Sequence, residues 1–91
     1  MLLKKKGAID MDLEAVNKML DEINDDRSVP KNIRISIIEA KSQLNAQADI
    51  RARVSTTVSI LDDISNDPNI PIYTRTQIWN IVSMLEVLDK R

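Results

Sequence analysis

Apolar residues recur every three or four positions in four stretches of the chain, with polar residues between them. The four stretches are residues 10–24, 30–46, 49–65 and 71–89. Their apolar sets are Leu13, Val16, Leu20 and Ile23; Ile33, Ile37, Ala40 and Leu44; Ile50, Val54, Val58, Leu61 and Ile64; and Ile78, Val82, Leu85, Val87 and Leu88. This spacing places each set on one face of an α-helix, so the pattern predicts four amphipathic helices.

Short polar segments connect these stretches. Residues 24–29 and 65–70 are rich in Asn, Asp and Ser, which compete with helical hydrogen bonds, and Pro30 or Pro71 then suits the first turn of the next helix. The joint at 45–49 has neither Gly nor Pro, so two alternatives remain: a break, or one long helix that invites pairing with a second chain. We expect the break and an all-α fold, an antiparallel up-and-down four-helix bundle with both acidic turns at one end.

The two halves of the chain show an internal repeat at an offset of 41 residues. Residues 20–44 and 61–85 share nine identities in 25 aligned positions, far more than unrelated segments share. The identical pairs are Leu20/Leu61, Asp21/Asp62, Ile23/Ile64, Asp26/Asp67, Pro30/Pro71, Arg34/Arg75, Ile37/Ile78, Ser42/Ser83 and Leu44/Leu85. Duplication of one helical hairpin explains this better than two similar hairpins arising independently.

The repeat also defines the domain organisation. We interpret residues 10–91 as a single four-helix domain, built from repeat units at about 9–46 and 50–89. Residues 1–9 form an N-terminal extension that is either flexible or continues the first helix. Met1 and Met11 are both candidate starts of the natural chain.

One element of the repeat, D-x-x-x-P-x-x-x-R, combines both charge signs around a proline. It occurs as Asp26, Pro30 and Arg34 and again as Asp67, Pro71 and Arg75. The arginine follows the proline by one helical turn, so it can reach back to the aspartate and form a bidentate ion pair that fixes the entry of the chain into the helix. We predict structural clamps; the alternative is that both arginines and both acidic turns form a docking surface for a partner.

The amino-acid composition excludes many catalytic mechanisms. The chain has no His and no Cys, which excludes imidazole bases, thiol nucleophiles, disulfides and zinc fingers. The single Gly rules out a glycine-rich phosphate loop. The acidic turns supply oxygen ligands, but they lack the spacing and mid-loop Gly of an EF-hand. We therefore predict a protein that is not an enzyme, with no cofactor, metal site or evident small-molecule substrate.

The charges give a second functional hypothesis. Thirteen Lys and Arg against fourteen Asp and Glu leave a net charge of −1, and Lys4–Lys6 is the one run of like charge. These lysines, with Arg51 and Arg53, are the residues through which a nucleic-acid- or ribonucleoprotein-associated factor would bind. No apolar run reaches the length of a membrane span, so we expect a cytoplasmic protein without membrane contact.

The helix expected at 71–89 is apolar over an unusually wide face. Trp79 and its repeat equivalent Ile38 either fill the core or lie outward and form an interaction surface with Ile81 and Val82. The leading hypothesis is a small helical protein–protein interaction or scaffold module, self-associating as a homodimer through the helix at 71–89.

The paired turn sequences carry a family resemblance. NDDRSVPKNIR at Asn24–Arg34 and NDPNIPIYTR at Asn66–Arg75 resemble an archaeal group catalogued as uncharacterised protein family 0147. The resemblance covers about residues 12–89. It implies a small archaeal, cytoplasmic, all-helical protein, and it brings no established activity, ligand or catalytic residue.

Overall fold

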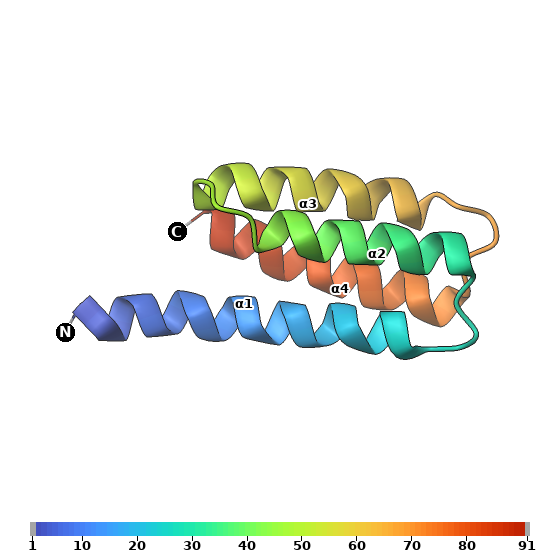
Figure 1. Cartoon of the computed structure of the whole chain (residues 1–91), viewed down its shortest axis with the longest axis horizontal. Helices are drawn as coiled ribbons and strands as arrows, with labels where there is room; N and C mark the ends of the chain where they lie inside the picture. Colours follow the sequence, from blue (N-terminus) through green and yellow to red (C-terminus); the bar gives the residue numbers. More distant parts are fainter. Residues whose placement is uncertain (1, 91) are drawn as a thin grey trace.

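Four helices make up the described part of the chain. The computed structural model describes the backbone of residues 2–90 and the side chains of residues 12–90. The helices are α1 (Leu2–Asp25), α2 (Lys31–Leu44), α3 (Ile50–Ser65) and α4 (Ile72–Asp89), and this region contains no strand. Successive helices run up and down (Figure 1). The predicted all-α four-helix bundle is confirmed. The backbone of the predicted extension at 1–9 belongs to α1 from Leu2 onward, whereas its side chains lie outside the described set.

The helices form a closed ring of neighbours. α1 packs against α2 and α4, and α3 packs against the same two helices. α2 and α4 therefore lie on one diagonal of the bundle, with no close approach of their backbones, and α1 and α3 lie on the other. The two acidic turns are at one end of the bundle, as predicted, and the α2–α3 joint, the start of α1 and the end of α4 are at the opposite end (Figure 1).

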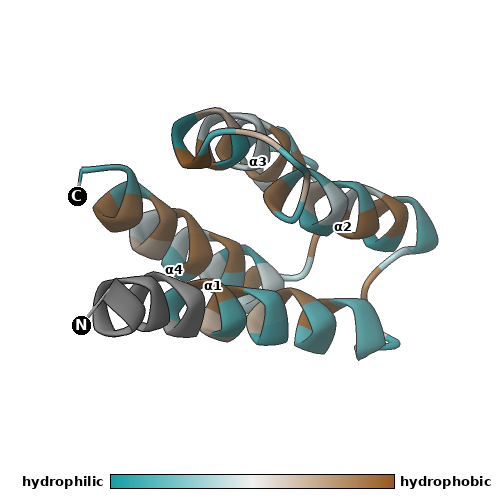
Figure 2. Cartoon of the chain, turned by 60° about the vertical axis from the view of Figure 1, so that its left-hand side comes forward, coloured by the Kyte–Doolittle hydropathy of each residue, from teal (hydrophilic) through white to brown (hydrophobic). Residues whose placement is uncertain are grey.

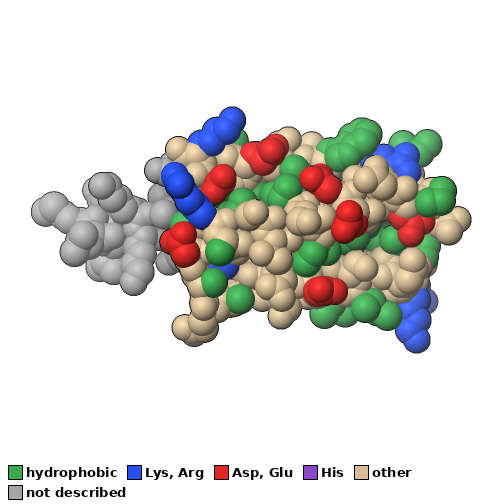
Figure 3. Space-filling view, turned by 90° about the horizontal axis from the view of Figure 1, so that it is seen from above, with side chains coloured by type: hydrophobic (Ala, Val, Ile, Leu, Met, Phe, Trp, Pro, Cys, Tyr) green, Lys and Arg blue, Asp and Glu red, His purple; other side chains and the backbone are tan. Residues whose placement is uncertain are grey.

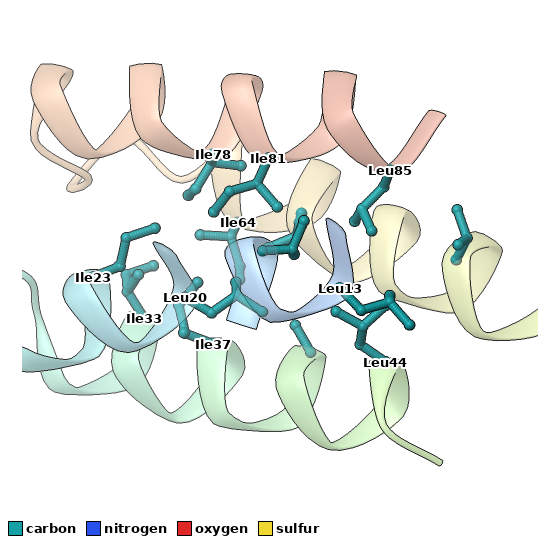
Figure 4. Packing of buried hydrophobic residues seen from close by; sticks show 14 of the residues in the cluster. Leu13, Leu20, Ile23, Ile33, Ile37, Leu44, Ile64, Ile78, Ile81 and Leu85 are labelled. Atoms are coloured by element: carbon teal, nitrogen blue, oxygen red, sulfur yellow. The ribbon is translucent and has the colours of Figure 1, made fainter. Parts of the chain in front are cut away.

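The core follows the 41-residue offset. The apolar faces of the helices turn inward (Figure 2), and side chains from all four helices meet along the bundle axis (Figure 4). Nine buried positions of the first hairpin recur 41 residues later: Leu13/Val54, Val16/Thr57, Leu20/Leu61, Ile23/Ile64, Val29/Ile70, Ile33/Thr74, Ile37/Ile78, Ala40/Ile81 and Leu44/Leu85. The two hairpins thus contribute equivalent faces to one core.

In two helices, α3 and α4, the buried face is rotated relative to the face predicted from the sequence. In α3, Thr57 is fully buried, while the predicted Val58 is only partly buried. In α4, Ile81 takes the inward place predicted for Val82, and Val87 is exposed. The cause is that both helices have apolar residues at adjacent positions, and a step of one residue turns the side chain by about 100°.

The α2–α3 joint is a break, as expected, although it has neither Gly nor Pro. Two side chains satisfy carbonyls at the end of α2. The side-chain amide of Asn45 donates to the carbonyl of Lys41 at 2.7 Å, and Arg53 Nε donates to the carbonyl of Leu44 at 2.8 Å. Asp49 has the extended backbone of an N-cap (φ −58°, ψ 143°), and its carbonyl accepts the Arg53 N–H at 3.0 Å. Side chains that satisfy the carbonyls at a helix end do the work that a glycine often does.

Candidate functional site

Both acidic turns have the same local geometry. In the first turn, Asp26 Oδ1 accepts the backbone N–H of Ser28 at 2.9 Å and its hydroxyl at 2.7 Å. In the second turn, Asp67 Oδ1 accepts the backbone N–H of Asn69 at 2.8 Å. An aspartate that accepts from the residue two positions later forms an Asx-turn, which reverses the chain without a glycine. The hydroxyl and N–H of Ser28 favour the charged carboxylate and lower the pKa of Asp26.

Each turn leads into a helix through its proline. Pro30 (φ −56°, ψ 150°) and Pro71 (φ −60°, ψ 146°) are extended residues at the N-cap positions of α2 and α4. Their carbonyls accept the first helical hydrogen bonds, from Arg34 at 3.1 Å and Arg75 at 3.0 Å. A proline supplies no N–H here, and none is needed at this position of a helix.

The two arginines do not pair with the turn carboxylates, in contrast to the predicted ion-pair clamp. Arg75 Nε donates to the carbonyl of Ser65 at 3.0 Å, and its Nη2 donates to the backbone carbonyl of Asp67 at 3.3 Å. The Nε atom of Arg34 is buried and has no hydrogen-bond partner. The carboxylates accept bonds inside their own turns, and Arg75 satisfies backbone carbonyls at and just beyond the end of α3.

The acidic turns do not form a cation site in the described region. No group of three or more carboxylates converges there in a way that would hold a metal ion. An open groove of about 280 Å³ lies near this end, between α2 and α3. It is lined by Asn32, Ile33, Ser36, Glu39, Ile60, Asp63, Ile64 and Asp67. One hydrogen bond crosses it, from Asn32 Nδ2 to Asp67 Oδ2 at 3.5 Å.

The four residues of the predicted interaction surface do not form one patch. Trp79 is 56% exposed and Ile38 is 55% exposed, so both lie outward rather than in the core. They are on α4 and α2, however, which lie diagonally opposite each other in the bundle, so the two outward side chains are on opposite sides of the molecule. Ile81 is fully buried, and Val82 is partly buried beside the core. Of the three predicted residues on α4, Trp79 therefore lies outward, Val82 lies at the edge of the core, and Ile81 belongs to the core.

Two pairs of side chains close the α1/α2 seam, the outer line along which α1 meets α2. Asn17 and Asn45 exchange two amide hydrogen bonds, at 3.1 and 2.8 Å. One helical turn away, Lys41 forms an ion pair with Asp21. Reasoning from the sequence alone missed these four residues. The signal available for them was the helical register, since each pair holds flanking positions of two adjacent helices.

The repeat offset assigns the corresponding positions of the α3/α4 seam. The residues 41 positions after Asn17, Asp21, Lys41 and Asn45 are Val58, Asp62, Val82 and Glu86. Val58 and Val82 pack partly against the core, whereas Asp62 and Glu86 are exposed. The α3/α4 seam thus has two valines where the α1/α2 seam has an amide and an ammonium group.

The basic residues predicted to bind nucleic acid have different surroundings in the structure. Arg53 is half-buried, and its guanidinium group is bonded to the end of α2. Arg51 is exposed on α3, and the side chains of Lys4–Lys6 lie outside the described residues. The face over α3 shows acidic and hydrophobic side chains side by side rather than a continuous basic surface (Figure 3). No helix in the described part of the chain is long and apolar enough to cross a membrane.

The fold and these polar contacts define a small four-helix protein whose polar side chains mainly fix turns, helix ends and seams. The family model of an uncharacterised protein family, UPF0147, matches residues 3–88, so the chain belongs to this family. The resemblance found in the turn sequences is thereby confirmed.

The relatives are archaeal proteins. The UPF0147 protein MJ1419 of Methanocaldococcus jannaschii is 51% identical over 75 residues, which cover 81% of this chain and 81% of that protein. The UPF0147 protein of Methanosarcina acetivorans is 49% identical over 72 residues, covering 78% of this chain and 74% of that protein.

Two solved structures share the fold. A UPF0147 protein from Thermoplasma acidophilum is 37% identical and superposes with a TM-score of 0.82, covering 89% of this chain and 98% of that one. The unknown-function protein MMP1188 is 50% identical with a TM-score of 0.79, covering 82% of this chain and 86% of that one. The family is uncharacterised and its function is unknown, so the comparisons identify the fold and the lineage, and they assign no activity.

Proposed function

We propose that this chain is a non-enzymatic, cytoplasmic protein–protein interaction module that associates with a second copy of itself through α4. The observation that carries the proposal is the position of Trp79, which is more than half exposed on a helix that also presents Ile72 at 80% exposure. Half-exposed tryptophans are expensive to leave in water and are enriched at the energetic centres of protein interfaces.

The size of the effect supports an interface. A tryptophan buries roughly 150–250 Å² when it is covered, so the exposed part of Trp79 represents about 100 Å² or more. At ~25 cal/mol per Å², covering it yields roughly 2–3 kcal/mol for each copy. In a symmetric dimer the two tryptophans contribute twice, which is enough to dominate an interface of modest area.

The non-enzymatic part of the proposal rests on how the chain uses its polar groups. Asp26 and Asp67 are occupied by their own turns, and Arg53 and Arg75 by carbonyls at helix ends. With neither His nor Cys in the chain, acid–base chemistry would depend on carboxylates with raised pKa values. The pKa of Asp26 is lowered by its hydrogen bonds from Ser28, not raised.

Sedimentation velocity over a wide range of protein concentrations tests the proposal. The native chain should change from monomer to dimer as its concentration rises. Trp79→Glu should weaken the dimer by about a hundredfold or more, because it places a charge where an aromatic ring is covered. Ile38→Glu is the matched control, since Ile38 has the same exposure at the equivalent position of the other hairpin. A native chain that stays monomeric, or equal losses in both variants, would contradict the proposal.

A further inference from the structure

The two outer seams of the bundle differ in a way that points to an occupant for one of them. The two seams are equivalent in topology, because each joins the two helices of one hairpin. The chain closes the α1/α2 seam with its own polar pairs, Asn17–Asn45 and Asp21–Lys41. At the α3/α4 seam, valines stand where the asparagine of α1 and the lysine of α2 stand, so no such bonds form there.

The substitution leaves one charge without its partner. Asp62 is the equivalent of Asp21, but the position of Lys41 is taken by Val82. Asp62 is exposed and forms no ion pair among the described residues. Trp79 lies one helical turn before Val82 and covers the same outer face of α4. The α3/α4 seam is therefore an apolar strip of Val58, Val82 and Trp79 beside an unpaired carboxylate.

The opposite charge lies on the same helix. Arg51, Val58 and Asp62 share one face of α3, since they are seven and four residues apart. Eleven residues of helix separate Arg51 from Asp62 by about 16 Å, which is too far for a contact within one chain. Arg51 is exposed and forms no ion pair among the described residues. The strip thus has a cation at one end of α3 and an anion at the other.

We infer that the occupant of the α3/α4 seam is the same seam of a second copy, packed antiparallel about a two-fold axis that crosses α3 near Val58. This arrangement places Arg51 of each copy opposite Asp62 of the other, with the two Val58 side chains at the centre and Trp79 of each copy at the Asp62 end of the strip, against the Arg51 end of the other copy. A two-fold interface repeats every contact, so one self-complementary charge pair supplies two ion pairs. The inference rests on the proposed function and adds the orientation and the pairing of the two copies.

Charge reversal tests this arrangement with soluble full-length chains. Arg51→Asp places two carboxylates together at each contact, and Asp62→Arg places two guanidinium groups together. Each variant alone should dimerise at least about tenfold more weakly than the native chain. A mixture of the two variants should restore dimers, because both contacts in the mixed dimer then join opposite charges. The matched control is Asp63→Arg, the same charge change one residue away, on the groove between α2 and α3.

The possible results separate the two proposals. Restored dimers in the mixture, with a silent Asp63→Arg control, would establish the antiparallel pairing. If the charge variants dimerise like the native chain while Trp79→Glu still abolishes the dimer, self-association through α4 stands and the antiparallel arrangement is wrong. If the native chain is monomeric at every concentration, both proposals are wrong.

Discussion

Thr74 offers a sharp test of how the core is stabilised. Its side chain is fully buried in the first turns of α4, and its Oγ1 atom has no hydrogen-bond partner. The equivalent residue of the first hairpin is Ile33, so the same place in the fold accepts an apolar side chain. A buried hydroxyl without a partner costs about 1–3 kcal/mol of desolvation. Thr74→Val keeps the shape of the side chain and removes that cost.

The second buried threonine provides the control. Thr57 is also fully buried, but its Oγ1 donates to the carbonyl of Arg53 at 2.7 Å and lies 3.5 Å from that of Ala40. Its equivalent in the first hairpin is Val16. Thr57→Val removes a hydrogen bond worth about 0.5–1.5 kcal/mol while it gains some apolar contact. We expect this variant to be slightly less stable than the native chain or equal to it.

Urea and thermal unfolding followed by far-ultraviolet circular dichroism compare the two variants. Thr74→Val should raise the free energy of unfolding by ~1–2 kcal/mol and the Tm by roughly 4–8 °C per kcal/mol. The two threonine variants should differ by at least about 1 kcal/mol. If Thr74→Val lowers the stability, or if both variants change it equally, the Thr74 hydroxyl is not a buried group that destabilises the fold for lack of a hydrogen-bond partner.

Two further predictions concern the core and the first turn. Leu61→Ala removes a fully buried side chain and should lower the free energy of unfolding by about 2–5 kcal/mol, measured by urea denaturation. Asp26 has a lowered pKa in the folded chain, so its contribution to stability is present above its unfolded pKa and is lost as the pH falls through the folded value. Asp26→Asn keeps an Asx-turn residue, and it should therefore flatten the loss of stability below about pH 4 that the native chain shows in acid titrations of the Tm. An unchanged acid profile in this variant would contradict the role given to the carboxylate.

The sequence predicted the helices, the turns and the shared end of the acidic segments, because periodicity and turn composition are local signals. It could not set the rotation of each helix to within one residue. Ile81 and Val82 are both apolar neighbours, and only packing against α1 and α3 decides that Ile81 points inward. The same limit applied to Trp79, whose exposure depends on that rotation.

The arginine clamp shows a second limit. The spacing of the repeat correctly predicted that Arg75 reaches back to the turn. It could not predict that the acceptors are backbone carbonyls rather than the carboxylate. The Asp67 carboxylate accepts from Asn69 and Asn32 instead, bonds that depend on the local turn geometry and on the packing of α2 beside the turn. The diagonal placement of α2 and α4 was a third limit, since it separates Ile38 from Trp79 and follows from the ring order of the helices.

The most direct test of the α3/α4 interface needs no mutation, because Trp79 is the single tryptophan of the chain. Acrylamide quenching of its fluorescence, measured over a range of protein concentrations, reports how much of the ring is open to solvent. In the monomer Trp79 is 56% exposed, and its fluorescence should be quenched readily. If the α3/α4 seam is the interface, quenching falls and the emission shifts to shorter wavelength in step with the dimer fraction measured by sedimentation. Dimers that form without any change in quenching would place the interface elsewhere and contradict the account.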